Sequence, residues 1–432
     1  MTGCLAGLAK EPATKLLSSA ATPHLTRRAT LGLGVAALAG CGRARDPARV
    51  SWWAMSTAGE NAPLLLPAFT AARGIAVDVQ ALPWTAAHAK VLTAFAGRAL
   101  PDVLMVANAW LAELTMLGAL QPVPPRLAAG LLPAANAAAS VDGALRAVPW
   151  FVDTQVQFFR RDLLAAVGQP APPTDWAGWQ ATARDLKRRR PDDFAVLLPL
   201  DWPEMLMTFA HQQPEPLLRD RASRGNFSSA GFRAAFAFYL GLFAERLAPA
   251  VNYAQVGDAL TAFARGTFAL LPSSAETVGD LARRPELPRD RWGIAAMPGR
   301  DGPAPGLLYG CSLAVTRDAA DPDRAWALVD YLTTPATQLR FHGITGNLPS
   351  RAAAWPELAA DPAAAPFATQ LSRGVAAPAV PEWARIIVEV QQIAERTVRG
   401  EFGVDAATRL MDTRVDALLA KRRWLLDRGM AA

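Results

Sequence analysis

The residues that most often carry out catalysis are sparse in this chain and show none of the familiar spacings. Only three histidines lie beyond residue 40 of the 432, namely His88, His211 and His342, and they are too far apart to form a metal-ligand pattern. The sequence has no His-Glu-x-x-His motif, no Walker phosphate loop and no Gly-x-Ser-x-Gly nucleophile elbow. We therefore predict no catalytic residue, no metal and no cofactor.

Carboxylates and aromatic rings are the remaining side chains that could take part in ligand binding or catalysis. The chain has 13 Trp against 4 Tyr. Trp often lines surfaces that hold a ligand with both apolar and polar parts, although a GC-rich gene would also enrich Trp. A glycoside hydrolase needs two carboxylates but no local motif. Glu60, Asp153 and Glu276, which lie near aromatic residues, therefore leave a hydrolase open as an alternative.

Residues 26–41 have the pattern of an export signal that ends in a cysteine. Thr26-Arg27-Arg28 precedes a small and apolar run over 29–40, which is shorter than the roughly 20 residues that span a bilayer as a helix. The run ends in Leu38-Ala39-Gly40-Cys41 and resembles the lipobox of bacterial lipoproteins. We predict a lipoprotein signal peptide over residues 1–40 and lipidation at Cys41. A chance cysteine after an ordinary signal is the alternative, and Sec or Tat export stays open.

The length and charge of the remaining chain indicate a globular body of two or more lobes. Beyond residue 40 there are 392 residues, with no apolar run long enough to cross a membrane. The whole chain carries a net charge of +6 and the part beyond residue 40 carries +3, which is too mild to predict nucleic acid as a partner. The basic run 187–190 is interpreted as a solvated helix end. Cys311 is the only cysteine after Cys41, so no internal disulfide is expected, and we predict a small buried residue.

Hydrophobic patterning predicts alternating strands and helices in the first part of this body. We expect strands at 49–54, 75–79 and 103–106 and helices at 61–73, 86–98 and 110–117. This alternation is typical of a parallel sheet covered on both faces. A second phase begins near residue 145. It contains predicted strands at 155–159, 292–295 and 313–315, a capped helix ending near 190, and helices at 229–246, 256–265, 321–333, 353–372, 381–399 and 405–422.

A series of short motifs stands in order along residues 49–422. They are Gly59-Glu60, Pro67-Ala68-Phe69, Gly74-Ile75-Ala76-Val77, Leu100-Pro101-Asp102-Val103, 118–122, Ala147-Val148-Pro149-Trp150 with Asp153, 158–164, 172–176, 263–269 and 346–351. Their order and spacing resemble the extracellular solute-binding proteins of bacterial ABC importers. Within that family they are similar to the carbohydrate-binding group that includes the maltose and trehalose binders.

The resemblance implies an α/β fold of the two-lobe periplasmic-binding-protein type, with an interlobe cleft and hinge crossings. One lobe would hold residues 42–152 and 300–344, and the other would hold 153–299 and 345–432. The implied function is to bind a carbohydrate, a di- or oligosaccharide such as an α-glucoside, and to deliver it to the permease subunits without chemistry. The implied protein is an exported monomer, periplasmic or at the cell surface, anchored through its lipid. A glycerol-phosphate-type binder of the same fold is the closest alternative.

The resemblance also implies which residues contact the ligand. Sugar hydroxyls suit acids, amides and Arg, and sugar C–H faces suit aromatic rings. The polar candidates are Glu60, Asn108, Asp153 and Arg351. The other candidates are Trp110, Trp150, Phe151, Trp202, Tyr309, Gly310 and Trp383.

Several of these candidates have a plain structural alternative. Glu60 would otherwise be a charge at a helix N-terminus, Trp110 a core residue and Arg351 a partner in a surface salt bridge. Some maltose and trehalose binders carry an acid just after the third strand, where this chain has Ala107-Asn108. The identity of the sugar therefore stays open.

Overall fold

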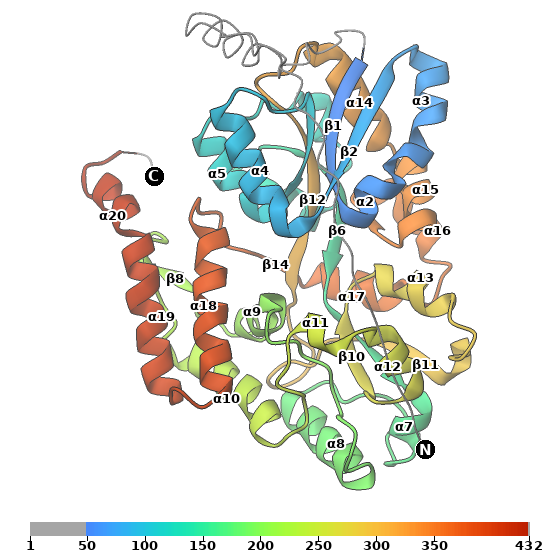
Figure 1. Ribbon diagram of the computed structural model, residues 1–432, viewed down its shortest axis with the longest axis vertical. Coiled ribbons are helices and arrows are strands. Elements are labelled where there is room, and N and C mark those ends of the chain that lie inside the picture. The colour runs from blue at the N-terminus through green and yellow to red at the C-terminus, as the bar shows by residue number, and fades with distance from the viewer. Residues whose placement is uncertain (1–48, 431–432) are drawn as a thin grey trace, which may run out of the picture. The chain divides into compact units, whose positions relative to one another are not determined.

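A seven-stranded mixed sheet forms the centre of one half of the protein (Figure 1). In this computed structural model residues 49–430 are described, so the predicted signal peptide and the predicted lipidation site Cys41 lie outside the described residues. The strand order is β13-β6-β12-β3-β1-β2, and β14 pairs with β12. The strands are β1 (Arg49–Met55), β2 (Ala76–Leu82), β3 (Val103–Ala107), β6 (Val148–Thr154), β12 (Leu307–Val315), β13 (Leu348–Pro349) and β14 (Val375–Ala376).

The predicted parallel sheet is confirmed for its first three strands. β1 pairs in parallel with both β2 and β3, and the helix between each pair of strands supplies the crossover. β12 runs antiparallel to β3 and to β6, so the complete sheet is mixed. The helices that accompany this sheet are α2 (Ser56–Asn61), α3 (Leu66–Arg73), α4 (Trp84–Ala96), α5 (Leu111–Met116), α6 (Pro133–Ala138), α14 (Pro322–Leu332) and α15 (Pro335–Thr345).

A smaller three-stranded sheet organises the other half of the protein. Its order is β10-β7-β11, from β7 (Val156–Arg160), β10 (Leu270–Ser273) and β11 (Trp292–Ala296), and both pairings are antiparallel. The helices of this half are α7 (Arg161–Ala165), α8 (Trp176–Arg189), α9 (Pro203–His211), α10 (Ala230–Ala244), α11 (Tyr253–Val256), α12 (Ala259–Arg265), α13 (Glu276–Ala282), α17 (Ala365–Ser372), α18 (Trp383–Val398), α19 (Val404–Leu418) and α20 (Ala420–Asp427). The short helix α16 (Trp355–Leu358) lies near α15 (Figure 1). Two short hairpins complete the fold, β4 (Ser140–Val141) with β5 (Ala144–Leu145), and β8 (Leu218–Arg219) with β9 (Arg224–Gly225).

Local sequence signals explain where the helices begin and end. The side chain of Asp175 accepts a hydrogen bond from the backbone N–H of Gly178 at 2.8 Å, so α8 has the predicted N-cap. The single helix predicted at 353–372 is instead two helices, α16 and α17. The break follows from Asp361, whose carboxylate accepts from the N–H of Ala363 at 2.8 Å in a turn that contains Pro362. No helix among residues 49–430 has the length and apolar character that crossing a bilayer requires.

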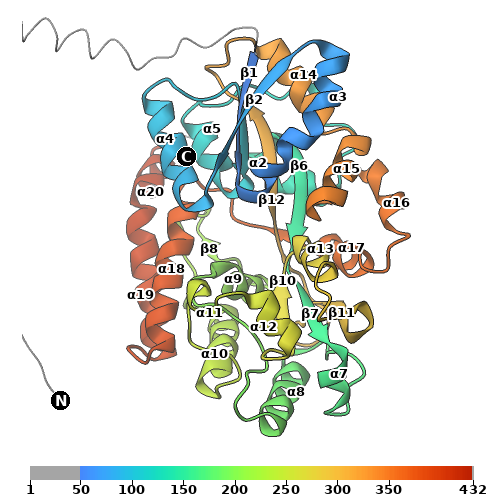
Figure 2. The same cartoon turned by 45° about the vertical axis from the view of Figure 1, so that its right-hand side comes forward.

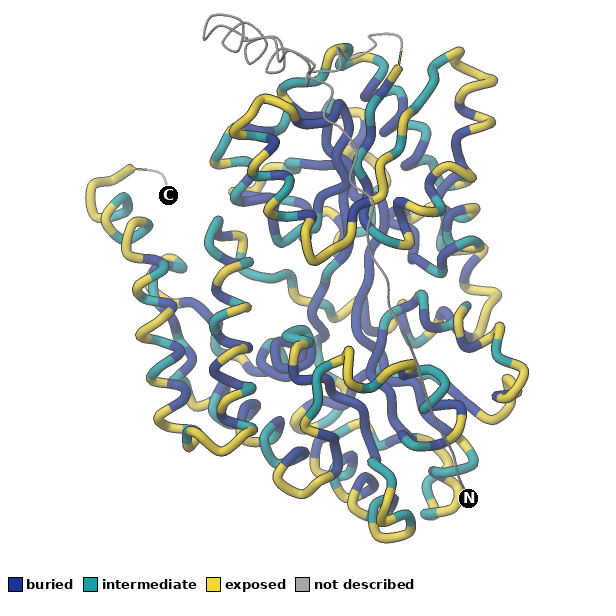
Figure 3. The backbone as a smooth tube through the Cα atoms, in the orientation of Figure 1, coloured by how far each residue is buried: buried dark blue, intermediate teal, exposed yellow. Residues whose placement is uncertain are grey.

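Each half has a large hydrophobic core, and a third buried cluster, which includes Val152 of β6 and Phe158 of β7, continues from one half into the other. Trp52, Phe69 and Leu104 are fully buried beneath the large sheet, whereas Trp179 and Phe236 belong to a core between α8, α9, α10, α18 and α19. The last two of these helices lie side by side in both ribbon views (Figure 2). The central strands are mostly buried and the outer helices carry the exposed positions (Figure 3). The two large cores thus belong to two lobes, and the third cluster joins them at the crossing strands.

The chain passes directly from one sheet into the other at Gln155. This residue separates the end of β6 at Thr154 from the start of β7 at Val156. Such continuity fits the hinge crossing that the sequence predicted near residue 150. The exact lobe bounds assigned from the sequence stay a prediction.

Candidate functional site

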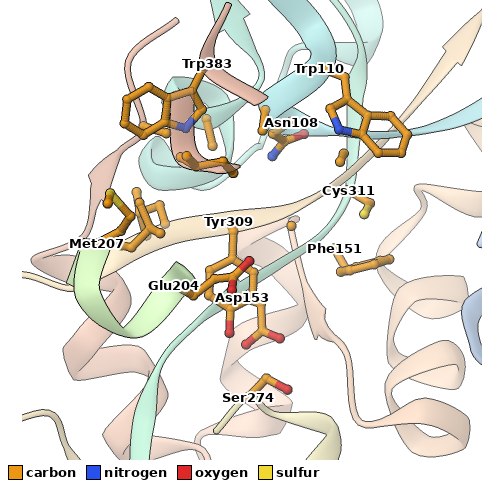
Figure 4. Close-up of a pocket in the computed structure, with 18 of the residues that line it drawn as sticks. Asn108, Trp110, Phe151, Asp153, Glu204, Met207, Ser274, Tyr309, Cys311 and Trp383 are labelled. Atoms are coloured by element: carbon orange, nitrogen blue, oxygen red, sulfur yellow. The ribbon is translucent and has the colours of Figure 1, made fainter. Parts of the chain in front are cut away.

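A cavity of about 570 Å³ lies between the elements of the two sheets. One side is lined by segments that follow the parallel strands β1 and β3, among them the 3-10 turn Asn108–Trp110. The carboxyl ends of parallel strands meet at one edge of a sheet, which brings these segments together. The starts of α9 and α13 line the other end, whereas Trp383 at the start of α18 lies toward Asn108 (Figure 4). Residues of the crossing strands β6 and β12 also line the cavity.

Aromatic rings form a large part of the cavity wall. The wall contains Trp84, Trp110, Phe151, Trp202, Tyr309 and Trp383. Trp110 is 9% exposed, and Trp84 meets it edge-on with ring centroids 5.8 Å apart. The aromatic surface is therefore contributed by several separate segments and is suited to contact the C–H faces of a ligand.

An imidazole supports the Trp110 indole. His88 of α4 stacks on Trp110 with ring centroids 4.8 Å apart and an interplanar angle of 27°. The Nε2 atom of His88 lies 2.7 Å from a carboxylate oxygen of Glu113 in α5. His88 does not itself line the cavity, so this pair holds the indole in place without reaching the ligand space.

Strand alternation explains why Phe151 and Asp153 both line the cavity. Residues two apart on a strand point to the same face, and both belong to β6. Asp153 is 3% exposed, and its Oδ1 accepts from the N–H groups of Thr154 at 2.8 Å and Ala275 at 3.4 Å. Burial raises the pKa of Asp153 well above its ordinary value, and the nearby carboxylate of Glu276 raises it further.

Two further carboxyl groups line the cavity at helix starts. Glu204 is the second residue of α9 and Glu276 is the first residue of α13. Burial raises the pKa of Glu204, and burial together with the charge of Asp280 raises the pKa of Glu276. The N-terminal amides of each helix favour a negative charge and partly offset this effect.

The phenol of Tyr309 lies among these acids. Its oxygen accepts a hydrogen bond from Nε2 of Gln155 at 3.0 Å. Burial, and then the charges of Asp153, Glu204 and Glu276, raise the pKa of Tyr309 well above its ordinary value. Figure 4 shows Asp153 and Glu204 close to the Tyr309 side chain. The phenol is therefore neutral and can donate a hydrogen bond into the cavity.

The backbone at Gly310 allows β12 to approach β6 closely. Gly310 has φ of +140°, and a Cβ atom there would lie 2.4 Å from the carbonyl oxygen of Phe151. Only glycine adopts this conformation without strain. The predicted glycine is thus required by the strand pairing beneath the cavity, and it also lines the wall.

No Lys, Arg or His lines this cavity, and all of its wall residues belong to the described part of the chain. The polar groups are carboxyls, amides and hydroxyls, including Asn108, Gln155, Ser274 and Asn347. No group of three or more His, Cys, Asp or Glu within residues 49–430 is arranged to hold a metal ion. The wall therefore suits a ligand rich in hydrogen-bond donors and apolar C–H faces.

The structure brings together eight of the eleven residues predicted from the sequence. They are Asn108, Trp110, Phe151, Asp153, Trp202, Tyr309, Gly310 and Trp383. Cys311, predicted to be buried, is 4% exposed and also reaches the wall. Whether these residues contact a ligand stays a prediction.

Three predicted residues do not line the cavity. Trp150 is adjacent to Phe151 on β6, so it points to the opposite face, where it stacks on Phe341 at 4.3 Å. Arg351 is turned inward: its Nε donates to the carbonyl oxygen of Thr333 at 2.9 Å, and its guanidinium also bonds the carbonyl of Ala129. It is therefore neither at the cavity nor in the surface salt bridge given as its alternative.

Glu60 is the third predicted residue outside the wall. It is exposed on α2, although Ser56, Thr57 and Ala58 of the same helix do line the cavity. The sequence placed Glu60 correctly after the first strand, but the helical turn directs it away from the wall.

Sequence reasoning missed several wall residues, among them three that are large or polar. Trp84, Gln155 and Glu204 line the cavity. Gln155 follows Asp153 by two, so strand alternation would have identified it. An acid directly after Trp202-Pro203 at a helix start was a signal for Glu204. Nothing local distinguishes Trp84 from a surface residue.

A family model and solved structures of binding proteins both match this chain. The family model described as "Bacterial extracellular solute-binding protein" matches residues 55–339. The structure of the sugar-binding protein MalE from the phytopathogen Xanthomonas citri matches with a TM-score of 0.81 and 40% identity, covering 88% of this chain and 99% of that one. No curated protein matches the chain significantly.

More distant solved structures share the fold. The GacH receptor of Streptomyces glaucescens has a TM-score of 0.77 at 22% identity, covering 86% of this chain and 98% of that one. Maltose-bound MalE3 of T. maritima has a TM-score of 0.76 at 20% identity, covering 86% and 99%.

Proposed function

Because the chain belongs to the bacterial extracellular solute-binding proteins, we propose that it binds a di- or oligosaccharide for an ABC importer. The members of this family and the similar solved structures are substrate-binding proteins rather than enzymes. The observation that carries the proposal is the wall of the cavity, where aromatic rings alternate with acids and amides. Aromatic faces suit sugar C–H groups, and carboxylates and amides suit sugar hydroxyls. The cavity volume of about 570 Å³ lies in the range of small-molecule sites. The MalE protein of X. citri is described as sugar-binding, which supports the same ligand class.

The composition of the cavity wall argues against a glycerol-phosphate ligand. Phosphate binding uses cationic side chains or free helix N-termini. No wall residue is cationic. The helices α9 and α13 begin at the wall, but each places an acid there, Glu204 in α9 and Glu276 in α13. A doubly charged phosphate in this cavity would meet three carboxyl groups and no cationic side chain.

We propose that the two lobes close over the sugar and present it to the permease subunits. The β6 to β7 crossing at Gln155 and the long strand β12 connect the lobes, and both lie beneath the cavity. Hinge closure around a ligand uses few linking segments of this kind. Export and a lipid anchor at Cys41 complete the proposal: the wild-type chain should sediment with membranes, whereas Cys41→Ser should remain in the supernatant.

Calorimetric titration with maltose, trehalose, longer α-glucosides, glucose and glycerol phosphate tests the ligand class. We expect micromolar or tighter binding of at least one di- or oligosaccharide and none of glycerol phosphate. Trp110→Ala should weaken that binding at least tenfold, because stacking surface is lost, whereas the exposed Trp424→Ala should leave it unchanged. Binding of glycerol phosphate with no sugar bound would overturn the proposal.

Recovery of the bound sugar separates a binding protein from a hydrolase. After long incubation with the tightest oligosaccharide, chromatography of the released ligand should return it at its original length. A shortened product that disappears in Asp153→Asn would instead support the hydrolase alternative, since Asp153 and Glu276 both line the cavity.

A further inference from the structure

The cavity wall carries three carboxyl groups and no cationic side chain. The carboxyl groups belong to Asp153, Glu204 and Glu276. The helix starts at α9, α13 and α18 are the positive features at the wall, and each supplies the equivalent of about half a charge. When all three carboxyl groups are ionised, the wall therefore keeps an excess of about one and a half negative charges that no side chain at the cavity neutralises.

The three carboxyl groups act on one region rather than on separate parts of the wall. The charge of Glu276 raises the pKa of Asp153, and all three carboxylates raise the pKa of the Tyr309 phenol. Asp153, Glu204 and Tyr309 lie next to one another in the close-up, with Ser274 below them (Figure 4). A ligand group placed beside Tyr309 therefore experiences the combined negative potential.

Unpartnered hydrogen-bond acceptors face the same space. Gln155 is 1% exposed, and while its Nε2 donates to Tyr309, its Oε1 has no partner. Oε2 of Glu204 is buried and also has no partner. Among the fully buried wall atoms the one donor without a partner is Nδ2 of Asn108. The phenol of Tyr309, which accepts from Gln155, can donate to only one of these acceptors. A buried acceptor without a donor is costly, so the ligand must supply donors at the acid-rich end of the cavity.

A protonated amine meets these requirements better than a hydroxyl. A hydroxyl donates one hydrogen bond and leaves the charge of the wall unchanged, whereas an ammonium group donates three and neutralises one carboxylate. Closing the lobes removes water from the carboxylates, and the cost of burying them falls when a cation is enclosed with them.

We infer that this cavity selects its carbohydrate by charge, binding a sugar with a protonated amine more tightly than its neutral counterpart and rejecting the counterpart with a carboxylate. The inference rests on the proposed sugar-binding function and specifies the ligand class within it. An aminated di- or oligosaccharide is the ligand that the wall of this chain suits best.

Three sugars that differ only at one carbon test the inference. Maltose, maltose with an amine in place of the hydroxyl at C6 of the non-reducing ring, and maltose oxidised there to the uronate are titrated at neutral pH in low salt. A second amine derivative with the substitution at C2 samples a different part of the cavity. We expect at least one amine derivative to bind about tenfold more tightly than maltose, from the difference between charge-assisted and neutral hydrogen bonds, and the uronate not to bind.

A charge-neutralising variant identifies the group responsible. Glu204→Gln keeps the shape of the wall and should reduce the preference for the amine over maltose to about twofold. The control is Glu357→Gln on α16, which is exposed and outside the wall and should leave the preference unchanged. Melting temperatures of both variants confirm that the protein is folded.

The outcomes separate this inference from the proposed function. If maltose binds and neither amine derivative binds more tightly, or if the uronate binds as well as maltose, charge selection is wrong while sugar binding stands. If the amine preference survives in Glu204→Gln and also in Asp153→Asn, the carboxylates are not its origin and the inference fails. If no neutral or aminated sugar binds, the proposed function itself fails.

Discussion

Replacing Asp153 by Asn is expected to weaken ligand binding while stabilising the ligand-free protein at neutral pH. Oδ1 of Asp153 accepts from the N–H groups of Thr154 and Ala275, which leaves Oδ2 for the ligand. Asn keeps the shape and can keep the Oδ1 contacts. The substitution therefore removes one negative charge from a buried wall without opening a cavity.

The expected stability change follows from the raised pKa of Asp153. Burial raises this pKa in the folded protein above the value of about 3.9 of an unfolded chain. The folded state then binds more protons than the unfolded state between the two pKa values. The free energy of unfolding therefore falls as pH rises from about 4 through the folded pKa, by about 1.36 kcal/mol for each pH unit of that window. Asn does not titrate, so the variant gains stability relative to the wild type across that window and matches it below about pH 4.

The expected affinity change is about one power of ten. A hydrogen bond to a charged group contributes roughly 1.5–3 kcal/mol and a neutral one roughly 0.5–1.5. Losing the charge at Oδ2 should therefore cost about 1.4 kcal/mol with a neutral sugar, or tenfold in Kd. Asn also presents a donor where the acid presented an acceptor, and a sugar hydroxyl can accept from it, which keeps the loss from being larger.

Two measurements on the same variant test this reasoning. Calorimetry gives Kd for the tightest sugar, and thermal unfolding between pH 4 and pH 8 gives the difference in Tm from the wild type. Asp290→Asn, an exposed aspartate outside the wall, serves as the matched control. A variant that melts below the wild type at pH 7 and keeps its affinity would refute the argument, because Asp153 would then hold the crossing strand instead of contacting the ligand.

Two further substitutions separate the ligand site from its framework. Gly310→Ala should destabilise the protein by about 1–3 kcal/mol, since φ is +140° and the new Cβ would meet the carbonyl of Phe151. The control is Gly343→Ala, at a helix position with open space around it. Thermal unfolding should show that this control raises the free energy of unfolding by about 0.5–1 kcal/mol. An equal loss of stability in both variants would contradict the reasoning. Arg351→Met should lower Tm, because the buried bonds to Thr333 are lost, with sugar affinity unchanged in calorimetry. Lost affinity at an unchanged Tm would return Arg351 to the ligand site.

Local patterns in the sequence determined the family and much of the chain's secondary structure. Strands β1, β2, β3, β7 and β11 lie where alternation and short apolar runs predicted them, because both are properties of neighbouring residues. The capped start of α8 at Asp175 is likewise a local hydrogen bond. Phe151 and Asp153 could be placed together because residues two apart on a strand share a face.

Which candidates reach the cavity depends on how distant segments pack against each other. Arg351 matched a ligand-binding motif, yet its guanidinium is held by the carbonyl of Thr333 outside the cavity wall. Glu204 reaches the wall through the start of α9, and Trp84 does so through its contact with Trp110. The direction of a side chain on a strand or helix is a local property, whereas the neighbour it meets belongs to a segment distant in the sequence. The composition of the wall, with three acids and no cation, therefore emerges only when the two lobes pack against their shared strands.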